Sequence, residues 1–251
     1  MQFRILRHLQ SRPSDSADLL GMSSYSRESH GGRSEAQFII FISHSPELFD
    51  DFSSISSGIF VDLGSGDGTP GVVIAALFRS INHSILIEND PDRTNNCERW
   101  IAGVHIYGCV IELHPCSYLL PWRFFDNHPL HSICAFYLNN YNGCLTPETS
   151  NDLAAMVEEH AGVGSVVVCL DIFFLLQPNW TCEVFSIVGI PRGHLSWLCR
   201  DSHSSHIYNE VYVYKYTKGL LSNRRGSNQR TINMAATRLS YSDFWNMHQC
   251  I

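Results

Sequence analysis

The stretch GIFVDLGSGDGTPG, from Gly58 to Gly71, decides the predicted fold. It begins with a short apolar strand, Ile59–Leu63. The loop that follows has a glycine at every second position: Gly64, Gly66 and Gly68. Glycine allows positive φ and close approach of a ligand to the main chain, because no Cβ stands in the way. Pro70 then opens an apolar segment, and proline suits the first turn of a helix. The stretch predicts a strand, a tight loop and a helix whose N-terminus faces a ligand.

A second apolar run, Ser84–Ile87, ends in Glu88, about 20 residues after the loop, where a doubly wound fold places a carboxylate on ribose hydroxyls. Two cofactor classes use this arrangement. The dinucleotide fingerprint G-x-G-x-x-G is satisfied from Gly66 onward, whereas D-x-G-x-G-x-G from Asp62 resembles motif I of the class I methyltransferases, which use S-adenosylmethionine (SAM). We favour SAM because the first glycine, Gly64, comes two residues after the aspartate. A glycine turn that binds no ligand is the third interpretation.

Length and composition argue against several other classes of protein, including membrane-spanning, disulfide-rich and metal-binding ones. A chain of 251 residues accommodates one α/β domain with extensions rather than two domains. The longest apolar run, Val166–Leu176, is interrupted by Asp171 and predicts no membrane span. The nine cysteines form no C-x-x-C pair and the thirteen histidines no H-E-x-x-H, so we predict neither a disulfide framework nor a metal site. The N-terminal residues 1–13 fit an organellar transit peptide or a mobile basic tail.

The charge is unevenly distributed along a chain whose net charge is −7. Residues 1–34 carry five arginines and three acidic residues, and residues 211–242 carry six basic residues and no acidic one. The pattern predicts a flexible basic N-terminal segment (1–34), a catalytic domain (35–216) and a basic C-terminal segment (217–251). A basic segment beside an acidic body could bind nucleic-acid phosphates on one side and a basic protein on the other. The alternative is that the basic segments are two solvated, flexible ends.

Further elements follow in the order of an α/β fold. We expect helices at Glu35–Phe52, Asp92–Ala102 and Thr146–His160, parallel strands at Val104–Leu113, Ser132–Leu138 and Ser165–Asp171, and two antiparallel strands within Gly193–Leu198 and His206–Tyr216. The predicted fold is the Rossmann-like fold of class I methyltransferases, a seven-stranded, mostly parallel sheet that ends in an antiparallel hairpin. Its fourth strand delivers Asn139 and Asn140 to the carboxyl edge of the sheet, where ligands of open α/β sheets bind.

Several motifs together resemble the DOT1 family of histone H3 lysine methyltransferases. They are VDLGSGDG from Val61, the glutamate that closes the second strand, L-N-N-Y from Leu138, and L-S-W from Leu195 before a tyrosine-rich strand. The resemblance covers about residues 31–216. It implies a nuclear enzyme that transfers methyl groups from SAM to a lysine in the globular core of histone H3 on nucleosomes, with DNA contact through the basic residues of 215–238.

The resemblance also implies site residues. Those that would bind SAM are Ser34, Phe60, Asp62, Leu63, Gly64, Ser65, Gly66, Gly68, Thr69, Glu88, Ser117, Tyr118 and Asn139. Those that would surround the lysine are Asn139, Tyr141, Trp197 and Tyr212, with Tyr214 as the alternative to Tyr212. The chain departs from the family at two places. Ser117-Tyr118 replaces an aspartate-phenylalanine pair beside the adenine, and Gly31 replaces a tyrosine in the entrance loop.

Two other functions compete with this one. Nucleic-acid and glutamine methylases carry N-P-P-Y after the fourth strand, whereas this chain has Asn139-Asn140-Tyr141-Asn142 there, without the prolines. The other is a SAM-binding chromatin module without catalytic activity, in which the basic segment binds the partner.

Overall fold

The structure is a computed structural model that describes residues 58–119, 121–128, 132–140, 145–171, 179–188, 210–219 and 229–233. These residues form one eight-stranded sheet in the order β3-β2-β1-β4-β5-β7-β6-β8. The strands are β1 (Gly58–Leu63), β2 (Ile81–Ile87), β3 (Val110–His114), β4 (Cys134–Leu138), β5 (Val166–Cys169), β6 (Trp180–Val188), β7 (Glu210–Lys218) and β8 (Gln229–Asn233). The helices are α5 (Thr69–Leu77), α6 (Pro91–Ile101), the 3-10 helix η2 (Arg123–Asn127) and α7 (Pro147–His160). None of these helices is both long and apolar enough to cross a membrane.

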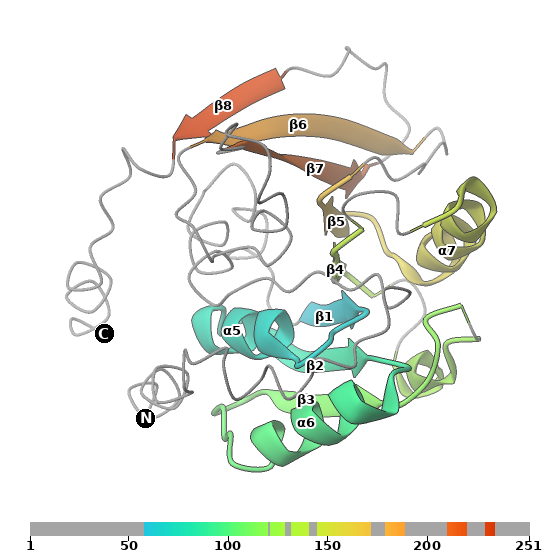
Figure 1. Ribbon diagram of the computed structural model, residues 1–251. Helices are drawn as coiled ribbons and strands as arrows, with labels where there is room; N and C mark the ends of the chain where they lie inside the picture. Colours follow the sequence, from blue (N-terminus) through green and yellow to red (C-terminus); the bar gives the residue numbers. More distant parts are fainter. Residues whose placement is uncertain are drawn as a thin grey trace, which may run out of the picture.

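Strands β1 to β5 are all parallel, and β7 enters antiparallel between β5 and β6. Figure 1 shows the parallel half of the sheet continuing into the antiparallel strands. This is the predicted α/β fold, a mostly parallel Rossmann-like sheet that ends in antiparallel strands. The prediction of seven strands omitted β8, which pairs in parallel with β6.

The predicted start of the third strand was wrong, and the antiparallel part of the sheet includes two strands, β6 and β8, that were not predicted. Strand β3 begins at Val110, not Val104, because the chain turns at Gly108, whose φ is +77°. The partner of β7 is Trp180–Val188, whereas the predicted partner, Gly193–Leu198, lies outside the described residues. The sheet continues beyond residue 216, since β7 ends at Lys218 and β8 lies within the predicted basic segment. The helix expected at Glu35–Phe52 also lies outside the described residues.

The two faces of β1 are both buried, as expected for a central parallel strand. On one face Gly71 of α5 packs so closely on β2 that a Cβ at this position would lie 2.1 Å from Leu86 Cδ2. On the other face Val61 and Phe136 join Leu153 of α7 in the main hydrophobic cluster. Both faces of the sheet are therefore covered at its centre, so a ligand of the central strands would bind at their ends.

Helix starts follow the sequence signals. Pro70 lies in the first turn of α5, and the Thr146 hydroxyl accepts a hydrogen bond from Thr149 N at the start of α7, as predicted. At α6 the cap is Asp90, whose side chain accepts hydrogen bonds from the backbone N–H groups of Asp92 and Arg93. This capped turn directly follows Glu88 and so fixes the chain at the end of β2.

The chain has only two lysines, Lys215 and Lys218, and both are buried in β7. Lys218 Nζ lies 2.9 Å from Glu158 Oε1 and donates hydrogen bonds to the carbonyls of Glu158 and Ala161 at the end of α7. Neither lysine can contact DNA phosphates from these positions. The predicted DNA contact of the basic segment 215–238 would therefore depend on residues other than these two lysines.

We expect Lys218→Met to lower the free energy of unfolding by about 3–5 kcal/mol, because the substitution leaves the Glu158 carboxylate and two carbonyls without their cation. Urea denaturation followed by circular dichroism measures this loss. Lys218→Arg, which keeps the charge, is the control and should lose less. Equal stability of Lys218→Met and the unmodified protein would show that the ion pair contributes nothing.

Candidate functional site

The carboxyl ends of β1, β2, β4 and β5 meet at one edge of the sheet, because these strands are parallel. The strand order reverses between β1 and β4, since β2 lies on one side of β1 and β4 on the other. Open α/β sheets bind their ligands in the crevice at this reversal. Four chain segments meet there: the glycine loop after β1, Glu88 after β2, the asparagine pair after β4, and Asp171 after β5.

The glycine loop is held by its own backbone and by Glu88. The N–H groups of Gly64 and Ser65 both donate to the Ile87 carbonyl, at 3.0 and 2.8 Å. Gly66 N donates to Glu88 Oε2 at 2.8 Å. Gly66 has φ +58°, and no atom of the described residues lies within 4 Å of the place where its Cβ would be. The loop therefore presents bare backbone to open space, as a site for a closely approaching ligand requires.

Glu88 is buried, and its carboxylate faces the loop. Besides the bond from Gly66 N, its Oε1 accepts a hydrogen bond from Asp90 N at 2.9 Å, and Arg93 Nη1 lies 4.0 Å from Oε2. A carboxylate has about four lone-pair positions, so two backbone bonds leave capacity for ligand hydroxyls. The structure thus places the predicted acid at the predicted strand end and orients it toward the loop.

Asp62 has a structural partner. Its side chain is buried on the α5 side of β1, where Oδ2 accepts a hydrogen bond from Gly71 N at 3.0 Å. Burial raises the pKa of this carboxyl well above its usual value, and the charges of Asp67 and Glu88 raise the pKa further. The hydrogen bond from Gly71 lowers the pKa but does not offset the burial. Asp62 therefore joins the loop to the start of α5. The predicted contact of Asp62 with a cofactor stays a prediction.

The backbone N–H groups in the first turn of α5 already donate to acceptors within the protein. Thr69 N donates to Asp67 Oδ1 at 3.1 Å, and Gly71 N donates to Asp62. Val72 N donates to the Gly68 carbonyl at 3.1 Å, and Pro70 has no N–H. An anion binds at a helix N-terminus through free N–H groups. This N-terminus offers none and carries two carboxylates instead.

Tyr118 lies against the loop from the side of β3. Its ring carbon Cε1 would be 3.7 Å from a Cβ at Gly64, and its carbonyl accepts a hydrogen bond from Trp122 Nε1. Trp122 is buried in the core, so this bond anchors the tyrosine backbone. The neighbouring Ser117 Oγ accepts a hydrogen bond from Leu119 N. The predicted aromatic partner of a base therefore does border the glycine loop.

The two asparagines after β4 have different environments. Asn140 is buried, and its side chain accepts hydrogen bonds from the N–H groups of Leu170 and Asp171 and donates one to the Asp171 carbonyl. It therefore fixes the end of β5. Asn139 is partly exposed, and since Leu138 pairs with Leu63, it lies beside the start of the glycine loop. Asn139 is the member of the pair that faces the site.

The predicted aromatic wall is only partly described. Tyr141, Trp197 and the entrance residue Ser34 lie outside the described residues. Tyr212 is exposed on β7. Because Cys169 pairs with Tyr214 in antiparallel register, Tyr212 lies beyond the end of β5, at the same edge as the loop.

Sequence reasoning gave Asp171 no role. Partial burial raises the pKa of the Tyr214 hydroxyl, and the charge of Asp171 raises it further, so this carboxylate lies on the Tyr214 side of the edge. Its position depends on the pairing of β5 with β7 and on the Asn140 bonds, which no local motif indicates. Asp67 was missed for the same reason, since its bonds to the Thr69 N–H and hydroxyl appear only in the folded loop.

No family model and no curated protein matches this chain. Among solved structures, a predicted O-methyltransferase from Agrobacterium tumefaciens is similar over 79% of this chain and 93% of its own, with a TM-score of 0.52 and 14% identity. An rRNA methylase from Streptococcus thermophilus covers 68% of this chain and 93% of its own, with a TM-score of 0.45 and 13% identity. A putative methyltransferase from Streptococcus mutans, in complex with SAH, covers 67% and 94%, with a TM-score of 0.44 and 12% identity.

At these identities the likeness shows the fold. Together with the strand order and the antiparallel β7, it identifies the fold as the Rossmann-like fold of class I methyltransferases. This agrees with the fold predicted from the sequence.

Proposed function

We propose that this protein is a SAM-dependent methyltransferase. The observation that carries the proposal is the acidic and fully bonded start of α5, where Asp62 and Asp67 occupy the N–H groups that a pyrophosphate would need. Glu88 adds a third carboxylate at the same loop. Phosphates would meet the carboxylates of Asp67 and Glu88 and find these N–H groups already bonded, whereas SAM carries a positively charged sulfonium and ammonium. The dinucleotide interpretation of the glycines is therefore disfavoured.

The described residues fit SAM in three further respects. Glu88 has lone pairs for the ribose hydroxyls, and Tyr118 offers a ring beside Gly64 for the adenine. The open space in front of Gly66 admits the ligand to the backbone. When bound, SAM supplies an electrophilic methyl group, which an amine nitrogen accepts as the carbon–sulfur bond breaks.

The chain's task in such a reaction is to align and to exclude water, because an in-line displacement at a methyl carbon needs little else. Asn139, beside the loop, would hold the acceptor nitrogen through a hydrogen bond. An amine acceptor must first lose a proton, since lysine has a pKa of about 10.4 in water. The exposed Tyr212 and the partly buried Tyr214 would form an aromatic wall that disfavours the charged amine.

For the acceptor, we propose a lysine of histone H3 on nucleosomes. This proposal depends on the DOT1 resemblance, which lies in motifs around the same edge: the glycine loop, Glu88 and the asparagine pair. In the structure these motifs converge, although their positions are shared by methyltransferases that act on other groups. The nuclear location and the DNA contact are parts of the same proposal, in which the contact would be made by the four arginines of the basic segment: Arg224, Arg225, Arg230 and Arg238.

Incubation with methyl-labelled SAM and either nucleosomes or naked DNA tests the acceptor. We expect label on lysine of histone H3. Because the protein's own two lysines are buried, self-labelling on lysine should be negligible, so lysine label reports the substrate. Label on DNA would exclude the histone proposal and keep the methyltransferase, and absence of label from both, with SAM bound, would favour a binding module. Absence of SAM binding in calorimetry would exclude both.

Within the same assay, Asn139→Ala is expected to lower turnover by about tenfold to a hundredfold, as the loss of one positioning hydrogen bond does. The dissociation constant for SAM should change much less than turnover. Asn95→Ala, on the exposed surface of α6, is the matched control and should behave like the unmodified protein. Unchanged turnover in Asn139→Ala would remove this residue from the acceptor site.

A further inference from the structure

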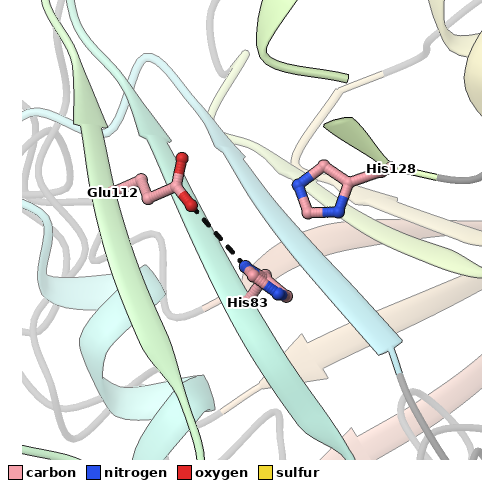
Figure 2. Close-up of side chains that lie close together, drawn as sticks. All are labelled: His83, Glu112 and His128. Atoms are coloured by element: carbon pink, nitrogen blue, oxygen red, sulfur yellow. Dashed lines mark ion pairs between the residues drawn. The ribbon is translucent and has the colours of Figure 1, made fainter. Parts of the chain in front are cut away.

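Away from the glycine loop, three side chains converge on the face of the sheet opposite α5. They are His83 from β2, Glu112 from β3 and His128 just after η2, and Figure 2 shows them side by side. One ligand atom from each lies within 4.8 Å of the others. All three are partly exposed, so a dissolved ion has access to them.

The sheet register explains the convergence. His83 pairs with Val110 and Ile85 with Glu112, and alternate residues of neighbouring strands share a face. His83 and Glu112 therefore lie on one face, one pleat apart. The backbone N–H of His128 donates a hydrogen bond to the Phe125 carbonyl at the end of η2, which places His128 near the other two residues. Its ring packs edge-on against the His83 ring, with the ring centroids 4.7 Å apart.

The distances suit a tetrahedral ion. Zinc bonds of about 2.1 Å to imidazole nitrogen and carboxylate oxygen place neighbouring ligand atoms about 3.4 Å apart. His83 Nδ1 and Glu112 Oε1 are already 3.6 Å apart, and the longest separation within the group is no more than 4.8 Å. Small side-chain rotations would bring the third ligand into range.

His83 Nδ1 needs a partner that the described residues do not supply. It is buried and makes no hydrogen bond within the described residues, and Glu112 Oε1 at 3.6 Å is too far for one. Buried polar atoms are rarely left unsatisfied in native proteins. The other carboxylate oxygen of Glu112 lies 3.4 Å from His114 Nε2, as in metal sites where a second residue orients the ligating carboxylate.

We propose that His83, Glu112 and His128 bind a zinc ion. Two imidazoles and one carboxylate are a donor set that zinc prefers, and they leave a fourth position for water. The histidines were not predicted as ligands because His83 and His128 come from separate elements and form no sequence motif.

The ion would not take part in methyl transfer. His83 precedes Glu88 by five residues of extended chain, about 16 Å at 3.3 Å per residue. Its role would be to fasten the edge strand β3 and the segment after η2 to β2. This inference is independent of the proposed methyltransferase activity.

The test uses the full-length protein, stripped of metal with a chelator and titrated with zinc, in the absence of SAM. We expect one bound zinc per chain and a higher thermal midpoint with zinc, since a ligand of the native state stabilises it. His83→Ala and His128→Ala should each weaken zinc binding at least tenfold. His105→Ala, an exposed histidine outside the cluster, is the control and should bind zinc normally.

Cobalt substitution distinguishes this site from the cysteines. The proposed ligands are two imidazoles and one carboxylate, with no thiolate among them. The cobalt spectrum should therefore lack thiolate charge-transfer bands. Their presence, zinc binding that both alanine variants retain, or no zinc bound at all would overturn the proposal.

Discussion

Glu88→Gln is expected to weaken SAM binding by about tenfold to 150-fold, the equivalent of losing one hydrogen bond to a charged acceptor. The carboxylate now accepts hydrogen bonds from Gly66 N and Asp90 N, one on each oxygen. Glutamine has one acceptor oxygen, so its NH₂ group would face one of these two donors. The substitution should therefore displace the glycine loop and remove the negative charge that the ribose hydroxyls and the cationic cofactor meet.

Isothermal titration with SAM measures the effect, and thermal unfolding of the same samples shows whether the fold persists. Glu98→Gln removes an equal charge from the exposed surface of α6 and serves as the control. If Glu88→Gln remained folded and bound SAM as tightly as Glu98→Gln, Glu88 would have no part in the cofactor site, and the proposed placement of SAM would be wrong.

Gly71→Ala should produce the largest loss of stability among the predicted variants at the glycine loop. A Cβ at this position would lie 2.1 Å from Leu86 Cδ2 and 3.0 Å from Ser84 Oγ, both buried on β2. Relief requires Leu86 or α5 to move within the packed core, and a shift of α5 would also strain the bond from Gly71 N to Asp62. Overpacking of a core usually costs about 1–3 kcal/mol, and the loss of that bond adds to it.

Urea denaturation of Gly71→Ala beside Gly103→Ala provides the measurement. At Gly103 the nearest atom to a new Cβ is the Trp100 carbonyl oxygen at 3.7 Å, an ordinary contact, so the control should stay within about 0.5 kcal/mol of the unmodified protein. Equal midpoints for the two variants would mean that α5 packs less tightly on β2 than the structure shows.

Glu88→Gln and Gly71→Ala test two different roles of the glycine loop, ligand binding and helix packing. Glu88 acts on the loop from the ligand side, whereas Gly71 acts from the packing side, between α5 and β2. Loss of SAM binding with stability retained is therefore expected for one, and loss of stability for the other. The third glycine of the fingerprint, Gly71, serves helix–sheet packing here as it also does in dinucleotide-binding folds, so it does not distinguish the two cofactor classes.

The central part of the fold was predictable from local patterns. A β-branched and aromatic run before the glycines, Pro70 at the helix start and Thr146 at the α7 cap each act within a few residues, so the sequence shows them directly. The partner of β7 was not predictable in this way. Trp180–Val188 pairs with β7 through contacts between strands, and nothing within the segment distinguishes it from neighbouring apolar runs.

The candidate site was likewise predictable only in part. Sequence alone placed the glycine loop, Glu88, Tyr118 and Asn139 at strand ends, because the ends of parallel strands share one edge. It did not separate the roles of the two asparagines. Burial of Asn140 against Asp171 and exposure of Asn139 depend on the pairing of β4 with β5.

What the sequence determined was the kind of sheet and the edge at which a ligand would bind, since strand ends, turns and helix starts are set by neighbouring residues. Only the tertiary structure decided which groups remain available there. It engages the N–H groups of α5 with Asp62 and Asp67, buries both lysines, and brings His83, Glu112 and His128 together. Those outcomes depend on register and packing between distant segments, where a shift of one residue turns a side chain to the other face.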